Sequence, residues 1–125
     1  MSIFIRPFAW LLAAAVTFAT LGPPGLRPHS DLGQDGEHAL AFILVGLAFG
    51  LAYPRRRLLS TAAAIVLIGV LELMQFWVPG RHARLEDFLV DALTACIGFA
   101  LAGGTDWLFT RLRATSAVAS EGPAE

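Results

Sequence analysis

Several polar residues stand in or beside strongly apolar stretches, where their side chains could do chemistry: His38, Glu72, Gln75, Arg81, Asp87 and Asp91. A charged side chain inside a membrane span costs about 2.5–3.5 kcal/mol on insertion scales, so each one calls for an explanation. The arginine can form a two-pronged pair with a carboxylate or a phosphate. Carboxylates that lie close together and away from water could share a proton. These residue types therefore predict either headgroup binding or proton chemistry.

The spacing of these residues places them on shared helix faces. Residues three or four apart are neighbours on a helix surface, so Glu72 and Gln75 share one face and Asp87 and Asp91 share another. His38 opens an earlier apolar stretch. If successive helices alternate in direction, all of these side chains lie in the outer half of the membrane. The sequence thus predicts one outward-facing polar pocket built from three helices and the short loop after the third.

A plainer interpretation of the same residues is a network of ion pairs and hydrogen bonds that joins the helices and has no ligand. Asp87 on its own could stabilise a helix N-terminus through the helix dipole. His38, Glu72 and Asp91 could in principle hold a divalent cation, but no ligand spacing supports this, and we expect no metal and no other cofactor. The sequence contains no phosphate-binding loop, zinc-protease motif or nucleophilic triad pattern. Whether the protein is an enzyme stays open.

Four apolar stretches must position these side chains, at about 7–21, 38–53, 58–78 and 87–109. About 20 residues cross the hydrocarbon core as a helix, and backbone groups in lipid must be satisfied internally. The chain has 125 residues and is 15% charged, against about 25% in soluble domains. We predict an all-α integral membrane bundle of four transmembrane helices over residues 1–113, and a disordered cytoplasmic tail over residues 114–125.

The arginines predict the orientation of the bundle. All nine basic residues are Arg. With the N-terminus inside, six of them face the cytoplasm and three face out, as the positive-inside rule requires. We therefore expect a multi-pass protein of a bacterial cell (cytoplasmic) membrane with both termini in the cytoplasm. An alternative is that the first stretch is a secretory signal ending near Ala19, which would leave three spans.

The run Glu72-Leu-Met-Gln75, followed by Pro79-Gly80-Arg81 and then Asp87, Asp91 and Gly98, resembles the pattern of the VanZ-like membrane protein family. His38-Ala-Leu-Ala-Phe42 is similar to the family's histidine at the start of an earlier helix. The chain differs where the family usually has Asp-Lys (here Gln34-Asp35), Asn (here Asp91) and Gly (here Thr94). The resemblance implies a small multi-pass protein of the cell envelope. The name-giving member is associated with reduced sensitivity to the glycopeptide teicoplanin, and no biochemical activity is established for the family.

We therefore expect a pocket that binds or modulates a membrane lipid or a lipid-linked cell-wall precursor, with Arg81 on the phosphate and Glu72 and Asp91 orienting the headgroup. The alternatives are a proton-coupled carrier or membrane enzyme that uses Glu72 and Asp91, and a purely structural membrane subunit. In the structural case, partners would dock on Gly46 and Gly50, whose spacing permits close helix contact. We expect no nucleic-acid partner, because the net charge is −1. The sequence leaves the oligomeric state open.

Overall fold

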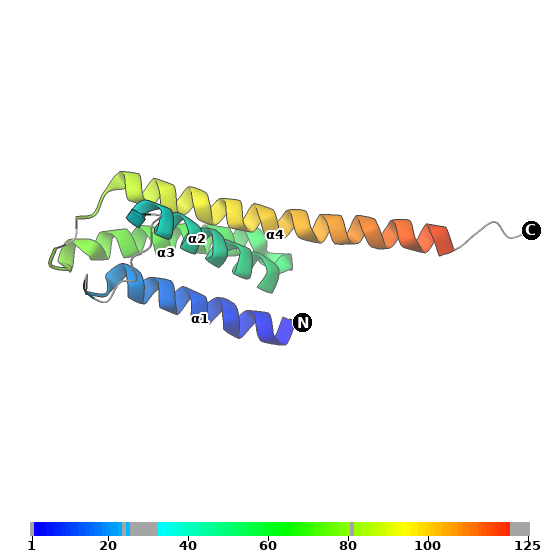
Figure 1. Ribbon diagram of the computed structural model, residues 1–125, viewed down its shortest axis with the longest axis horizontal. Coiled ribbons are helices and arrows are strands. Elements are labelled where there is room, and N and C mark those ends of the chain that lie inside the picture. Colours follow the sequence, from blue (N-terminus) through cyan, green and yellow to red (C-terminus); the bar gives the residue numbers. More distant parts are fainter. Residues whose placement is uncertain (1, 24, 26–32, 81, 121–125) are drawn as a thin grey trace, which may run out of the picture.

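The computed structural model describes residues 2–23, 25, 33–80 and 82–120, which form four long helices (Figure 1). These are α1 (Ser2–Leu21), α2 (Gly33–Ala52), α3 (Arg57–Met74) and α4 (Leu85–Ser120). Two short 3-10 helices flank α3, namely η2 (Pro54–Arg56) before it and η3 (Gln75–Trp77) after it. No strand occurs in the described part of the chain. The predicted all-α bundle of four helices is confirmed.

The outer surface of the bundle is apolar. Three helical stretches are long and apolar enough to cross a membrane, namely Phe4–Leu21, Pro54–Trp77 and Leu85–Ala117, and the shorter Gly36–Ala52 is also apolar. Large side chains point outward along all of these helices, and Leu58 is 89% exposed. A soluble protein rarely leaves so large an apolar surface in water, whereas hydrocarbon is its natural solvent. The chain is a membrane protein.

The helices alternate in direction, which brings distant parts of the sequence together at each end of the bundle (Figure 1). At one end, called here the η3 end, lie the start of α2, the end of α3 with η3, and the start of α4. At the opposite end, called the η2 end, lie the start of α1, the end of α2, η2 and the start of α3. Helix α4 passes the η2 end and projects beyond it.

Small residues let α2 and α4 pack backbone to backbone, which is the most extensive contact between two helices here. A Cβ added to Gly46 would strike the carbonyl oxygen of Ala95, and one added to Gly98 would strike the carbonyl oxygen of Ile43. Gly50, one turn further along α2, is buried against α4 as well. The hypothesis that Gly46 and Gly50 dock a partner is therefore wrong, because the chain's own α4 already occupies this surface.

Helix α4 is longer than its apolar stretch. Its 36 residues span about 54 Å at 1.5 Å per residue, well beyond the roughly 30 Å of hydrocarbon. The helix runs without a break through Gly103 and Gly104 and includes residues 114–120, where the sequence predicts the beginning of a disordered tail. These seven residues include three alanines, the best helix formers, and neither proline nor glycine to stop the helix. Residues 121–125 of the predicted tail lie outside the described residues.

Candidate functional site

The central residue of the candidate site is Glu72, in the last turn of α3 at the η3 end. Its side chain is buried, and both carboxylate oxygens accept hydrogen bonds. The backbone N–H of Arg84 donates to Oε1 at 2.6 Å, and Nε2 of Gln75 donates to Oε2 at 3.1 Å. Gln75 is itself buried, at the start of η3. The carboxylate is therefore held in one position by two donors, one from its own turn and one from the following loop.

A sharp turn carries Arg84 to Glu72. After η3, the N–H of Val78 donates to the carbonyl of Gln75 at 3.1 Å. Gly80 follows with φ of +80°, in the left-handed region that favours glycine. The chain then reverses and α4 begins at Leu85. The third helix ends at Met74 and η3 at Trp77, slightly before the predicted break at Pro79-Gly80. The turn at Pro79-Gly80 returns a backbone donor to the carboxylate.

A second polar pair joins α2 to α4. Nδ1 of His38 lies 3.6 Å from Oδ2 of Asp91, and their side chains are 22% and 5% exposed. The pair is an ion pair when the imidazole is protonated. Asp91 comes from the second turn of α4 and His38 from the second turn of α2. This contact connects two helices that the sequence separates by 53 positions, and no local pattern identifies it.

Asp87 lies one turn before Asp91, in the first turn of α4, and is half-buried. A carboxylate is favoured at that position by the helix dipole. Glu72 interacts electrostatically with Asp87, Asp91 and His38. The structure therefore gathers residues from three helices into one group, called here the polar cluster: His38, Glu72, Gln75, Asp87 and Asp91. The remaining residue of the predicted site, Arg81, lies outside the described residues.

A layer of apolar side chains closes the inner side of the polar cluster. Phe42, Ile68 and Ala95 form a buried group, with Val16 and Phe88 packed against it. Phe42, Ile68 and Ala95 each lie four residues from a member of the polar cluster on the same helix, so they form the next turn inward. The polar cluster therefore lies between this apolar layer and the η3 end of the bundle.

The polar cluster carries three carboxylates and a single imidazole, so negative charge is in excess. Such a group can accept hydrogen bonds from hydroxyls, pair with an ammonium group or hold protons. Among the described residues, no group of three His, Cys, Asp or Glu side chains is placed to hold a metal ion. A cavity of about 390 Å³ is present in the structure, but it lies between α1, α2 and α3, and no member of the polar cluster lines it.

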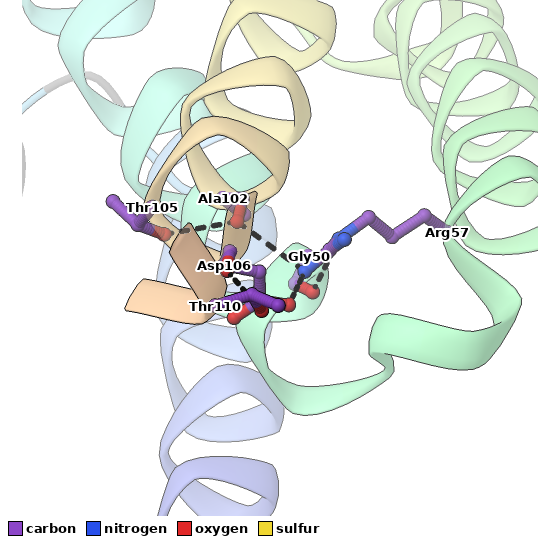
Figure 2. Close-up of polar contacts among 6 residues, drawn as sticks. All are labelled: Gly50, Arg57, Ala102, Thr105, Asp106 and Thr110. Atoms are coloured by element: carbon purple, nitrogen blue, oxygen red, sulfur yellow. Dashed lines mark hydrogen bonds and ion pairs between the residues drawn. The ribbon is translucent and has the colours of Figure 1, made fainter. Parts of the chain in front are cut away.

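A second polar network lies near the η2 end, and the sequence analysis did not predict it (Figure 2). Arg57, the first residue of α3, donates from Nε to the carbonyl of Gly50 at 3.0 Å and from Nη2 to the carbonyl of Ala102 at 3.3 Å. Its guanidinium also pairs with Asp106 of α4. Gly50 belongs to the last turn of α2, where carbonyls lack helical partners. Two features of the sequence could have indicated this network: Asp106 is an acidic residue in an apolar stretch, and Arg57 stands at the start of a helix.

We expect Arg57→Ala to lower the free energy of unfolding by about 1–3 kcal/mol, because the carbonyl of Gly50 loses its side-chain donor and Asp106 loses its ion pair. Stability can be measured by titrating detergent-solubilised protein with denaturing detergent and following helical circular dichroism. The matched control is Arg55→Ala, an exposed arginine of η2, which should change stability by less than about 0.5 kcal/mol. Equal losses for the two variants would show that the network of Arg57 does not stabilise the bundle.

Comparison with known proteins gives one finding. A family model described as VanZ/LLP1 matches residues 3–109. No curated protein and no solved structure matches the chain. The matched range contains every member of the polar cluster and both residues of the Arg57–Asp106 pair.

Proposed function

The chain belongs to the VanZ/LLP1 family, and from that premise we propose that it is a bacterial cell-envelope protein whose polar cluster binds the headgroup of a membrane lipid or of a lipid-linked cell-wall precursor. The observation that carries this proposal is the burial of Glu72 and Asp91 at one end of an apolar bundle. They are 7% and 3% exposed. Ionisable groups inside membrane proteins are costly, and they mark functional sites more often than structural ones.

The charge of the polar cluster indicates which headgroups fit. Three carboxylates favour a group that presents an ammonium or several hydroxyls. Arg84, whose side chain is exposed beside the cluster, would take the adjoining phosphate together with Arg81 from the same loop. A headgroup with both an amine and a phosphate, such as phosphatidylethanolamine, satisfies both requirements.

The distribution of arginines supports an orientation in which the polar cluster faces out of the cell. In the described part of the chain, one arginine, Arg84, lies at the η3 end. The others lie at the η2 end or on the part of α4 beyond it: Arg6, Arg55, Arg56, Arg57, Arg111 and Arg113. Cytoplasmic loops carry the excess of basic residues. We therefore place the η2 end and both termini in the cytoplasm and the polar cluster in the outer leaflet.

The test is native mass spectrometry of the purified chain extracted from vesicles of phosphatidylethanolamine and phosphatidylglycerol. We expect wild type to retain phosphatidylethanolamine, and Asp91→Asn and Glu72→Gln to lose it because they remove charge while keeping shape. The matched control is Glu86→Gln, an exposed carboxylate in the first turn of α4, which should behave as wild type. Retention of phosphatidylethanolamine at the wild-type level by Asp91→Asn and Glu72→Gln, or equal loss in all three variants, would contradict headgroup binding at the polar cluster.

A second candidate function, a proton-coupled carrier, is favoured by the separation of 3.6 Å between His38 and Asp91. A histidine beside a buried carboxylate can exchange a proton with it. In vesicles that enclose a pH-sensitive dye, a carrier would produce a proton flux that Asp91→Asn abolishes and Glu86→Gln leaves unchanged. The absence of flux in vesicles that still show selective lipid retention would favour binding over transport.

A further inference from the structure

The cavity between α1, α2 and α3 is a second place where a ligand fits. Its volume of about 390 Å³ lies within the range of small-molecule sites, roughly 300–1,000 Å³. Its walls are mostly apolar and include Val16, Phe42, Leu67 and Ile68. Phe42 and Ile68 belong to the layer that closes the polar cluster, so the cavity lies on the other side of that layer.

The cavity is elongated along α3. Seven residues of that helix line it at the three- and four-residue intervals of one helix face, from Leu59 to Leu71. Twelve residue steps correspond to about 18 Å along the axis. A long apolar cavity of this kind suits an extended hydrocarbon chain better than a compact ligand.

The end of the cavity at the η2 end is polar and positively charged. Tyr53, Arg56 and Ser60 line it there. The Tyr53 hydroxyl accepts a hydrogen bond from Nε1 of Trp10 at 3.1 Å, which leaves its own proton available to a ligand. The guanidinium of Arg6 lies 5.2 Å from the centre of the Tyr53 ring. Arg56 therefore lines the cavity close to the tyrosine, whereas Arg6 lies against the tyrosine ring, donates from Nε to the carbonyl of Ala52 and does not line the cavity.

The positive charge at this end of the cavity is not neutralised by the neighbouring acid. Asp106 is the acidic residue that the described part of the chain places near the η2 end, and it pairs with Arg57. Arg56 is exposed. Basic pockets between transmembrane helices on the cytoplasmic side attract anionic lipid headgroups, and arginine binds phosphate in a two-pronged geometry.

We propose that this cavity holds one acyl chain of an anionic phospholipid, whose phosphate is bound by Arg56 beside the hydroxyls of Tyr53 and Ser60. The acyl chain occupies the apolar part of the cavity, and the charged end of the cavity binds the headgroup. This site lies at the opposite end of the bundle from the polar cluster. It does not depend on the function proposed for that cluster.

The first arm of the test measures charge selectivity. The full chain is purified from vesicles of phosphatidylglycerol and phosphatidylcholine, and retained lipid is measured by native mass spectrometry. Wild type should prefer phosphatidylglycerol, and Arg56→Gln should lower its retention by about fivefold, the effect of one arginine on an anionic lipid. The matched control is Arg55→Gln, an exposed neighbour that does not line the cavity, which should behave as wild type. Equal retention of both lipids by wild type, or equal loss in the two variants, overturns the proposal.

The second arm measures the fit of the acyl chain. Ala64 lines the cavity and Ala62, two residues earlier, does not. Ala64→Phe should abolish retention of phosphatidylglycerol, whereas Ala62→Phe should preserve it, and helical circular dichroism verifies that both variants fold. Retention by a folded Ala64→Phe variant overturns the proposal. If Ala64→Phe does not fold, the exposed Arg56 variant still decides the question.

A third variant separates this site from the polar cluster. Asp91→Asn should leave retention of phosphatidylglycerol unchanged, because Asp91 lies at the η3 end and does not line the cavity. Loss of phosphatidylglycerol in Asp91→Asn, with retention in Arg56→Gln, would place the anionic lipid at the polar cluster and overturn the inference. If the polar cluster does not bind phosphatidylethanolamine, the effect of Arg56→Gln on phosphatidylglycerol retention still tests the cavity independently.

Discussion

Gly98→Leu is expected to remove about 3 kcal/mol or more of stability, because no space exists for a side chain at this position. Even a single Cβ would strike the carbonyl oxygen of Ile43 and approach the backbone nitrogen of Leu47 at 2.7 Å. Backbone atoms of a packed helix cannot rotate away as the end of a flexible side chain can. Overpacking of a close contact typically costs about 1–3 kcal/mol, and the backbone clash places this case at or above the upper end. The variant should separate α2 from α4.

The measurement is a denaturation titration in detergent micelles, together with the yield of monodisperse protein in size-exclusion chromatography. Gly104→Leu is the matched control, because it is the same change on the same helix where an added Cβ meets nothing within 4 Å. We expect it to be neutral or slightly stabilising, since leucine favours helix over glycine by roughly 0.5–1 kcal/mol. A similar loss in both variants would mean that the close approach of α2 and α4 is not what holds the bundle together.

Glu72→Ala is the other change with a large expected effect, a loss of about 2–5 kcal/mol of stability. The alanine removes the acceptor of two donors, Nε2 of Gln75 and the backbone N–H of Arg84. A buried polar group left without a partner costs about 1–3 kcal/mol. The loop that connects η3 to α4 should also detach from α3, because the Arg84 contact joins them.

Glu72→Gln separates hydrogen bonding from charge at the same position. The glutamine can still accept from Arg84, and Gln75 can rotate its amide to restore the other bond. We expect the free energy of unfolding of this variant to lie within about 1 kcal/mol of the wild-type value. The variant should nevertheless lose the lipid binding proposed for the polar cluster. If the glutamine variant is as unstable as the alanine variant, the negative charge itself is required for folding, and the interpretation of the polar cluster as a network that joins the helices gains support.

The contrast between these two variants also distinguishes the functional hypotheses for the polar cluster. A purely structural network has no ligand, so any effect of Glu72→Gln should be confined to stability. A headgroup site or a proton carrier requires the carboxylate. The stability of Glu72→Gln and its lipid retention therefore need to be measured on the same preparation.

Local relations within single helices were predictable from the sequence. The pairs Glu72–Gln75 and Asp87–Asp91 follow from helical spacing. The alternating direction of four apolar helices then brings the pairs to one end of the bundle, together with His38. The Pro79-Gly80 turn was also identifiable, because proline and glycine interrupt helices for stereochemical reasons. The membrane environment follows from composition, and the helical class follows from the length of the apolar stretches, because backbone groups in lipid must be satisfied internally.

Contacts between helices were decided by the tertiary structure. The 53-residue separation of His38 and Asp91 and the 49-residue separation of Arg57 and Asp106 have no counterpart in local pattern. The donor from Arg84 to Glu72 is a backbone N–H, which every residue except proline carries and which no sequence motif reveals. Only the fold shows that Gly46 and Gly50 of α2 pack against α4 rather than against a partner protein.

The physical reason lies in the solvent. In water, a helix shows its buried face as an apolar stripe on a polar surface, so periodicity reports which side faces inward. In lipid, the inner and outer faces are both apolar, and the rotation of each helix about its axis leaves little trace in the sequence. The sequence by itself therefore determined the helices, the membrane and the end of the bundle where the polar residues gather. The tertiary structure alone decided which faces meet, which charges pair and where the cavity lies, because those outcomes depend on helix rotation.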